Sequence, residues 1–234
     1  WYLEHTKWLD AITSGDYQWL ENEKDNRVKR AFISVLKYSL GNDDVSSFLQ
    51  TIIRSDTSYY SIADAFRVLA IIDSSSAKKY VDGLLNTESH NDIIRRSALS
   101  YFGQIKNRYN YNLLKELASY GVFSWESRPS IITELGKYQK QRPGTLNFIL
   151  PFINDKDRFV RMSVIKQIGL HGSKSHFSLL DRAVESDPVL SINSHRAKEK
   201  IIGRVKRKKT DNSDQNTVEE LEKKINEIKN ILNY

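Results

Sequence analysis

The chain has 234 residues, of which 39% are hydrophobic and 28% charged, a balance typical of a folded globular protein rather than a disordered one. With 10 glycines and 4 prolines it has too few turn residues for a β-sandwich, so helices are expected. Cysteine is absent, which excludes disulfides and thiolate metal sites and favours a reducing, cytoplasmic location. No apolar run of about 18 residues occurs, so neither a membrane span nor a membrane partner is expected.

Composition divides the chain into a long helical part and two distinct ends. Trp1 is neither an initiator methionine nor part of a signal peptide, so residues 1–15 are expected to join a preceding domain. Residues 16–209 carry the repeats described below, and residues 210–216 form a polar linker. Residues 217–234 begin with a capping-box pattern and continue as an amphipathic helix. This terminal helix is expected to dock on the rest of the chain, on a second copy or on another domain.

Apolar residues recur with a spacing of 33 residues along the chain. One such column is Phe32, Ala65, Ala98, Ile131, Val164 and Ala197. Four residues further on, a second column is Leu36, Leu69, Phe102, Leu135, Ile168 and Ile201. Positions four apart share one face of an α-helix, so these columns predict the buried stripe of one helix in every repeat.

A column of capping residues precedes this stripe and marks where each of these helices begins. Its members are Asp25, Ser58, Asn91, Ser124, Asp157 and Leu190. All but Leu190 have a side-chain oxygen that can accept from the free backbone N–H groups at a helix start. Asp187 followed by Pro188 is expected to replace the missing cap, and Pro129 is expected to delay the fourth helix to about Ser127.

A shorter helix is expected before each of these, so that every repeat is a helix pair. The predicted first helices span residues 17–23, 44–54, 77–86, 112–120, 145–153 and 174–185. The predicted fold is therefore all-α, an α-α superhelix of six 33-residue helix pairs followed by a C-terminal helix.

Residues 149–169 of the fifth repeat identify the type of solenoid. An apolar helix with a proline is followed by an acidic turn, by Val160-Arg161 and by an aliphatic residue before Gly169. This pattern resembles the HEAT repeat consensus, and Ile94-Arg95 echoes it in the third repeat. The resemblance covers about residues 16–205 and implies a HEAT-like solenoid.

Residues 107–136 carry a second resemblance. An apolar helix is followed there by Gly121, by Arg128 and by Leu135-Gly136, a run similar to the C-terminal region of aminopeptidase N-like zinc metallopeptidases. This resemblance implies a noncatalytic C-terminal domain that shapes a substrate chamber, with zinc in the parent enzyme. The catalytic His-Glu-x-x-His and Gly-x-Met-Glu-Asn motifs of that family do not occur in the chain, so we expect no catalytic residue, metal or cofactor here.

Basic residues recur directly after the start of the second helices, as Lys29, Arg95, Arg128 and Arg161. We expect these side chains to pair with turn acids and helix-end carbonyls of neighbouring repeats, because a guanidinium can donate several hydrogen bonds at once.

A separate set of cations is expected on the opposite, concave face of the second helices, where it surrounds small serine and threonine side chains. Its members are Arg30, Arg67, Arg96, Lys137, Lys140 and Lys166. These residues could bind an acidic peptide, a peptide carboxylate or a nucleic-acid backbone, or they could form an ordinary solvated surface. The net charge of +7, with 36 basic and 29 acidic residues, is compatible with both interpretations.

Three functions follow from these features. The preferred one is a noncatalytic interaction module of a zinc aminopeptidase, whose partners are the preceding catalytic domain and a peptide or protein. The alternatives are a free-standing protein-binding scaffold and a nucleic-acid-binding HEAT protein that uses the basic groove.

Overall fold

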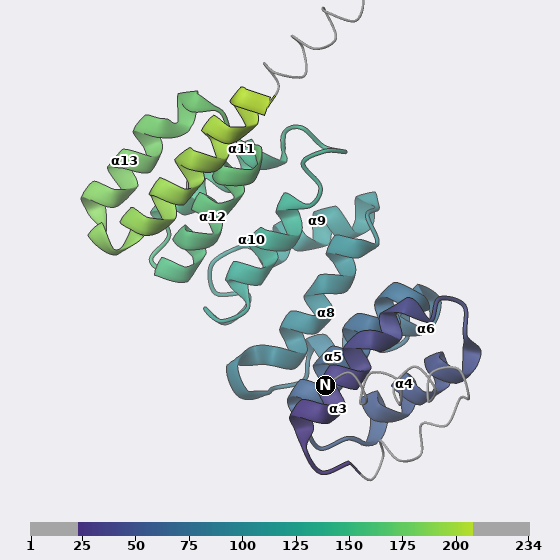
Figure 1. Cartoon of the computed structure of the whole chain (residues 1–234). Coiled ribbons are helices and arrows are strands. Elements are labelled where there is room, and N and C mark those ends of the chain that lie inside the picture. The colour runs from purple at the N-terminus through teal and green to yellow at the C-terminus, as the bar shows by residue number, and fades with distance from the viewer. Residues whose placement is uncertain (1–22, 208–234) are drawn as a thin grey trace, which may run out of the picture.

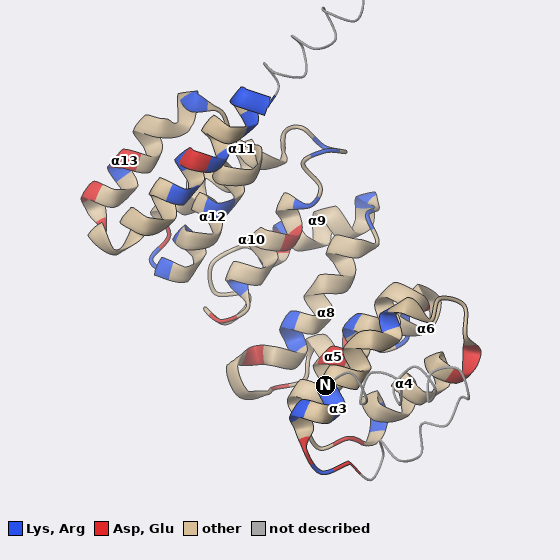
Figure 2. Ribbon diagram, viewed as in Figure 1, with Lys and Arg blue, Asp and Glu red and all other residues tan. Residues whose placement is uncertain are grey.

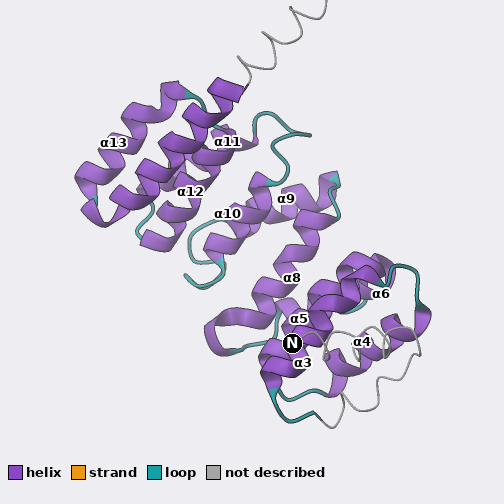
Figure 3. Ribbon diagram, in the orientation of Figure 1, coloured by secondary structure: helices purple, strands orange, loops and turns teal. Residues whose placement is uncertain are grey.

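The computed structural model describes residues 23–207, and this part of the chain is an all-α superhelix (Figures 1 and 3). Within these residues no strand occurs, and an isolated bridge between Tyr120 and Phe123 is the extent of β pairing. The predictions for residues 1–15, for the first helix up to residue 22, for the linker 210–216 and for the terminal helix lie outside the described residues. The count of six repeats therefore stays a prediction.

The second helices of the pairs lie side by side and form one face of the superhelix (Figure 1). They are α3 (Asn26–Val35), α5 (Tyr59–Ile72), α8 (Ile93–Gln104), α10 (Arg128–Gly136), α12 (Arg158–His171) and a last helix over residues 191–207. Both predicted apolar columns are buried throughout, and they contribute to a single continuous core.

The first helices are shorter and more broken. They are α4 (Asp43–Ser55), the pair α6 (Ser74–Lys78) and α7 (Val81–Leu85), α9 (Arg108–Leu117), α11 (Thr145–Ile149) with the 3₁₀ helix η3 (Leu150–Asn154), and η4 (Lys174–His176) with α13 (Phe177–Ser186). The single helix expected over residues 77–86 is wrong, because Asp73 caps an earlier start at Ser74 and the backbone breaks after Lys78. Three further 3₁₀ turns are η1 (Leu36–Tyr38), η2 (His90–Asp92) and η5 (Pro188–Leu190).

The capping column is confirmed at three of its six positions. The side chains of Asp25, Ser58 and Asp157 accept from backbone N–H groups of the first turn that follows each of them. Asp187 accepts from the N–H of Val189, as expected of the substitute cap. At the fourth helix Ser124 accepts from the N–H of Ser127, and α10 begins directly after that residue.

Asn91 is the exception in this column, because it does not cap α8. Asn91 and Asp92 both have left-handed backbones, with φ of 52° and 50°, and the Ser89 hydroxyl accepts from the N–H of Ile94 instead. This backbone turns the Asp92 carboxylate into the structure, where Ser127 donates to it at 2.9 Å and Ser124 also donates to it. The predicted cap is therefore replaced by an acid that joins two repeats.

Glycines in the second helices let neighbouring helices approach closely. A Cβ atom added to Gly103 would lie 1.7 Å from a Glu134 carboxylate oxygen, and one on Gly136 would lie 1.9 Å from the Gln167 side-chain oxygen. At Gly169 the added atom would lie 3.0 Å from the Cα of Ala197. The contacts α8–α10, α10–α12 and α12 with the last helix thus each depend on a missing side chain.

At three of its four positions the basic column at the start of the second helices joins successive repeats, as predicted. The Lys29 ammonium lies 3.0 Å from an Asp56 carboxylate oxygen in the next turn. Arg161 donates to the backbone carbonyl of Asp155 in its own repeat and to the Asp187 carboxylate, at 2.6 Å, in the next one. Arg161 therefore holds the end of one helix pair and the turn of the following pair. Arg95 differs, because it donates within its own repeat, to the carbonyl of Leu85 and to the Asp92 carboxylate.

Arg128 makes the most buried of these joints. Two of its nitrogens donate to the two carboxylate oxygens of Asp155, at 2.9 and 2.5 Å, and it also donates to the carbonyl of Ala118. The Arg128 side chain is 3% exposed and that of Asp155 is 8% exposed. Burial by itself raises the pKa of Asp155, but the hydrogen bonds from Arg128 and from the N–H of Asp157 outweigh it and hold this pKa below its usual value.

We expect Arg128→Met to destabilise the fold by roughly 3–5 kcal/mol, because it leaves the Asp155 carboxylate buried without its charged partner. Urea denaturation of the full chain, followed by circular dichroism, measures this change. Arg182→Met is the matched control, since Arg182 is exposed and makes no hydrogen bond or ion pair with the described residues. Equal unfolding midpoints for the two variants would contradict the prediction.

Candidate ligand-binding groove

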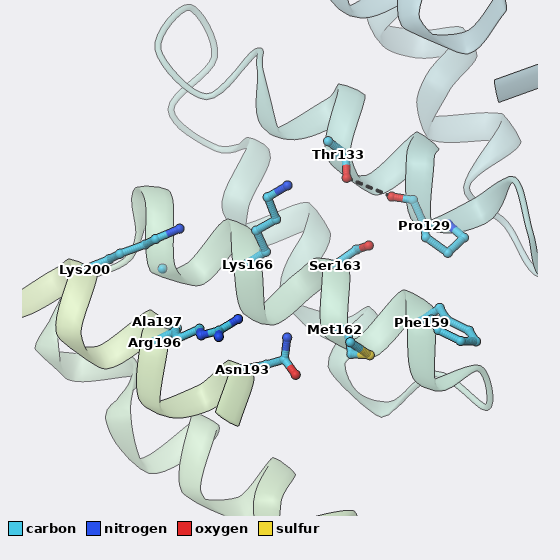
Figure 4. Close-up of a pocket in the computed structure, with 11 residues that line it drawn as sticks. Pro129, Thr133, Phe159, Met162, Ser163, Lys166, Asn193, Arg196, Ala197 and Lys200 are labelled. Carbon is cyan, nitrogen blue, oxygen red and sulfur yellow. Dashed lines mark hydrogen bonds between the residues drawn. The ribbon is translucent and has the colours of Figure 1, made fainter. Parts of the chain in front are cut away.

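A groove of about 400 Å³ lies between α10, α12 and the last helix, on the second-helix face; we call it the C-terminal groove (Figure 4). It is lined by Pro129, Thr133, Phe159, Met162, Ser163, Lys166, Gly169, Asn193, Arg196, Ala197 and Lys200. The close approach of the last helix at Gly169 places side chains of three successive repeats around one hollow.

The C-terminal groove has a basic end and an apolar end. Lys166, Arg196 and Lys200 gather at one end, while Phe159 and Met162 lie towards the other (Figure 4). The polar side chains of Ser163 and Asn193 lie between them and form no hydrogen bond with the described residues, so both can donate to a ligand. The Thr133 hydroxyl is already engaged, because it donates to the Pro129 carbonyl at 3.0 Å.

The cations at the basic end have no acidic partner in the part of the chain that the structure describes. By contrast, Lys198 of the last helix pairs with Asp181. Basic positions along α12 and the last helix are visible in Figure 2. Three unpaired cations around one hollow attract an anion, and Arg196 offers the planar donor fork that suits a carboxylate.

Exposed aromatic rings extend the apolar end towards α8. Trp125 and Phe159 stack with their ring centroids 5.8 Å apart, and they are 57% and 52% exposed. Both rings line an adjoining hollow of about 340 Å³, together with Arg96 and Pro129. Since Pro129 and Phe159 line both hollows, the apolar surface is continuous between them.

Two of the predicted site residues share one acidic partner at the N-terminal half of this face. Arg30 and Arg67 both pair with Asp64, at 2.6 and 2.7 Å, and Arg30 also lies 4.8 Å from the ring centre of Tyr60. Burial lowers the pKa of Arg67, and the Asp64 carboxylate opposes that shift. The shared carboxylate of Asp64 thus joins these arginines and links α3 to α5.

The other predicted residues differ in their surroundings. Lys137 pairs with Glu134 at 2.6 Å, and Lys140 is exposed just beyond the end of α10. Arg96 donates to the Ser130 hydroxyl at 3.0 Å and lines the adjoining hollow. Lys166 is therefore the one member of the predicted set that lines the C-terminal groove.

Sequence reasoning missed Arg196, Lys200 and Asn193. Arg196 lies 33 residues after Ser163, in a column that was already expected to face the groove, so the repeat spacing contained the signal that could have found it. Lys200 occupies the position of Gln167, which is buried in the preceding repeat, and no repeat column predicts its exposure.

No protein-family model matches the chain, and no curated protein matches its sequence. Among residues 23–207 no three His, Asp or Glu side chains lie close enough together to hold a metal ion. No helix within those residues is both long and apolar enough to cross a membrane.

We expect Glu134→Gln to stabilise the fold at pH 8 relative to the parent chain. Burial raises the pKa of Glu134, although Lys137 and Arg67 oppose the shift, so the ionised side chain carries a cost in the folded state. Because the pKa of Glu134 is higher in the folded than in the unfolded chain, the protonated side chain stabilises the fold at a pH below the unfolded-state pKa. This stabilisation is lost as the pH rises through the folded-state pKa of Glu134. Thermal unfolding at pH 4 and pH 8 tests this, and the advantage of Gln should shrink at pH 4.

Asp64→Asn is the contrasting control for this experiment. It removes a carboxylate that is shared by Arg30 and Arg67, so we expect it to lower the unfolding temperature at pH 8. A lower unfolding temperature for Glu134→Gln at pH 8 would show that its ion pair with Lys137 outweighs the cost of burial.

Proposed function

We propose that this chain is a noncatalytic binding module whose C-terminal groove binds the carboxylate end of an extended peptide or protein segment. The observation that carries the proposal is the polarity of the groove, in which Lys166, Arg196 and Lys200 converge unpaired at one end and Phe159 and Met162 lie at the other. A ligand that fits this arrangement has one anionic end and an apolar body.

A peptide that ends in apolar residues has this shape. Its terminal carboxylate would accept from the Arg196 guanidinium and from the two lysine ammonium groups, and the Asn193 amide and Ser163 hydroxyl would donate to its last peptide groups. Its side chains would cover Met162 and Phe159. A nucleic acid carries a phosphate at every nucleotide and would need cations along the whole groove. Because one end of the groove is apolar, a peptide fits it better than a nucleic acid does.

The sequence resemblance described above supports a wider proposal for the biological setting. In this proposal the chain is the C-terminal domain of a zinc aminopeptidase, and a preceding catalytic domain holds the zinc. A groove that binds peptide carboxylates would then hold the end of the substrate that the enzyme does not cleave. If no catalytic domain accompanies the chain, the same groove serves a free-standing scaffold.

Peptide binding can be measured by fluorescence anisotropy with a labelled hexapeptide that ends in Leu-Phe. We expect the free carboxylate to bind at least tenfold more tightly than the C-terminal amide, because a hydrogen bond to a charged group contributes about 1.5–3 kcal/mol. The triple variant Lys166→Met, Arg196→Met, Lys200→Met should abolish this difference between carboxylate and amide.

The matched control is Lys78→Met, Lys79→Met, Arg182→Met, which removes the same side-chain types from exposed positions outside the groove. Equal affinities for the carboxylate and the amide, or equal losses in both triple variants, would overturn the proposed site. Tighter, groove-dependent binding of single-stranded or duplex DNA, steeply weakened by salt, would instead favour the nucleic-acid alternative.

The wider proposal has its own test, on the native protein that contains this sequence. We expect that protein to hold zinc and to release N-terminal amino acids from peptides, and we expect the present chain to do neither. A native protein that holds no zinc and shows no aminopeptidase activity would refute the wider proposal and leave the peptide-binding groove standing.

A further inference from the structure

The sequence places a strongly acidic segment shortly after the last described helix, from which Lys208 and Lys209 separate it. Residues 210–222 contain five carboxylates and no lysine or arginine, and the carboxylates belong to Asp211, Asp214, Glu219, Glu220 and Glu222. This segment lies outside the described residues. It follows a helix whose exposed cations Arg196 and Lys200 line the C-terminal groove.

The length of the chain allows this segment to reach the groove. Lys200 and Arg196 precede residue 207 by 7 and 11 residues, which corresponds to about 10 and 17 Å along an α-helix. Asp211 and Asp214 follow residue 207 by 4 and 7 residues, a reach of roughly 13 and 23 Å for an extended chain. A chain that turns back after residue 207 can therefore lay Asp214 and the glutamates beside both cations.

The charges of the two parts are complementary. Lys166, Arg196 and Lys200 have no ion-pair partner among the described residues, while residues 210–222 carry the carboxylate groups that such cations bind. A tethered segment also has an effective concentration on the order of 1 mM at a site within its reach, which favours even weak docking. No aspartate or glutamate lines the C-terminal groove, so no carboxylate there would repel the acidic segment.

We propose that residues 210–222 dock in cis on the basic end of the C-terminal groove. The docking itself is inferred from the unpaired cations and does not depend on the function proposed above. Its consequence does depend on that function, because the docked segment competes with the carboxylate ligand. Ligand affinity then depends on whatever draws this acidic segment away from the groove.

The test uses the full chain with the segment neutralised by Asp211→Asn, Asp214→Asn, Glu219→Gln, Glu220→Gln and Glu222→Gln. We expect the neutralised chain to bind the Leu-Phe hexapeptide about tenfold more tightly than the parent chain, since an effective concentration on the order of 1 mM no longer competes. A synthetic peptide of residues 210–222 should bind the neutralised chain, and Lys166→Met, Arg196→Met, Lys200→Met in that chain should remove this binding.

The control is a chain with Asp82→Asn, Glu88→Gln, Glu116→Gln and Glu185→Gln, which removes exposed carboxylates elsewhere. We expect this chain to bind the hexapeptide as the parent does, and an equal gain in affinity would overturn docking in favour of a general charge effect.

The remaining outcomes separate the two proposals. Equal hexapeptide affinity in the parent and neutralised chains would overturn docking and leave the proposed function intact. Groove-dependent binding of the 210–222 peptide without any hexapeptide binding would support docking and overturn the proposed function. If the parent chain's hexapeptide affinity fell as its own concentration rose, the occupant would be the segment of a second copy, which overturns docking in cis.

Discussion

The superhelix depends on a recurring interaction, in which the cation at the start of a second helix binds an acid of the following repeat, as Lys29, Arg128 and Arg161 do. Arg128 shows it most completely, because it donates to the carbonyl of Ala118 behind it and to both oxygens of Asp155 ahead of it. A guanidinium can do this because its donors lie in one rigid plane and point in several directions. These ion pairs lie at the ends of the helices, in the turns between repeats. The side chains on the exposed face of the second helices are therefore not needed to hold successive repeats together.

What that face can bind is decided by local pairing rather than by its total charge. At the N-terminal half, Asp64 lies between Arg30 and Arg67, and their charges stabilise the contact of α3 with α5. At the C-terminal half, the groove beside Lys166 and Arg196 contains no acid, so its cations stay available. The two stretches thus differ in how their cations are paired, because the Asp64 carboxylate engages both arginines of the first stretch.

More of the fold than of the candidate site could be predicted from the sequence. The apolar columns, most of the caps and the basic column depend on spacing and local chemistry, which a single sequence displays. Asn91 failed as a cap because Asp92 is drawn to Ser124 and Ser127, a contact between repeats that no local pattern reveals. The ion pairs of the predicted site residues are hidden for the same reason, since a column predicts which way Arg67 points but cannot predict that Asp64 will pair with it.

The C-terminal groove owes its polarity to the irregularity of the last repeat. In earlier repeats the position of Lys200 is held by Glu134 and Gln167, whose side chains cover Gly103 and Gly136 of the preceding helix. In the last repeat Ala197 packs on Gly169 instead, so the side chain of Lys200 is not needed to fill that contact and stands at the groove. Lys200 thereby joins Lys166 and Arg196, which likewise have no acidic partner among residues 23–207.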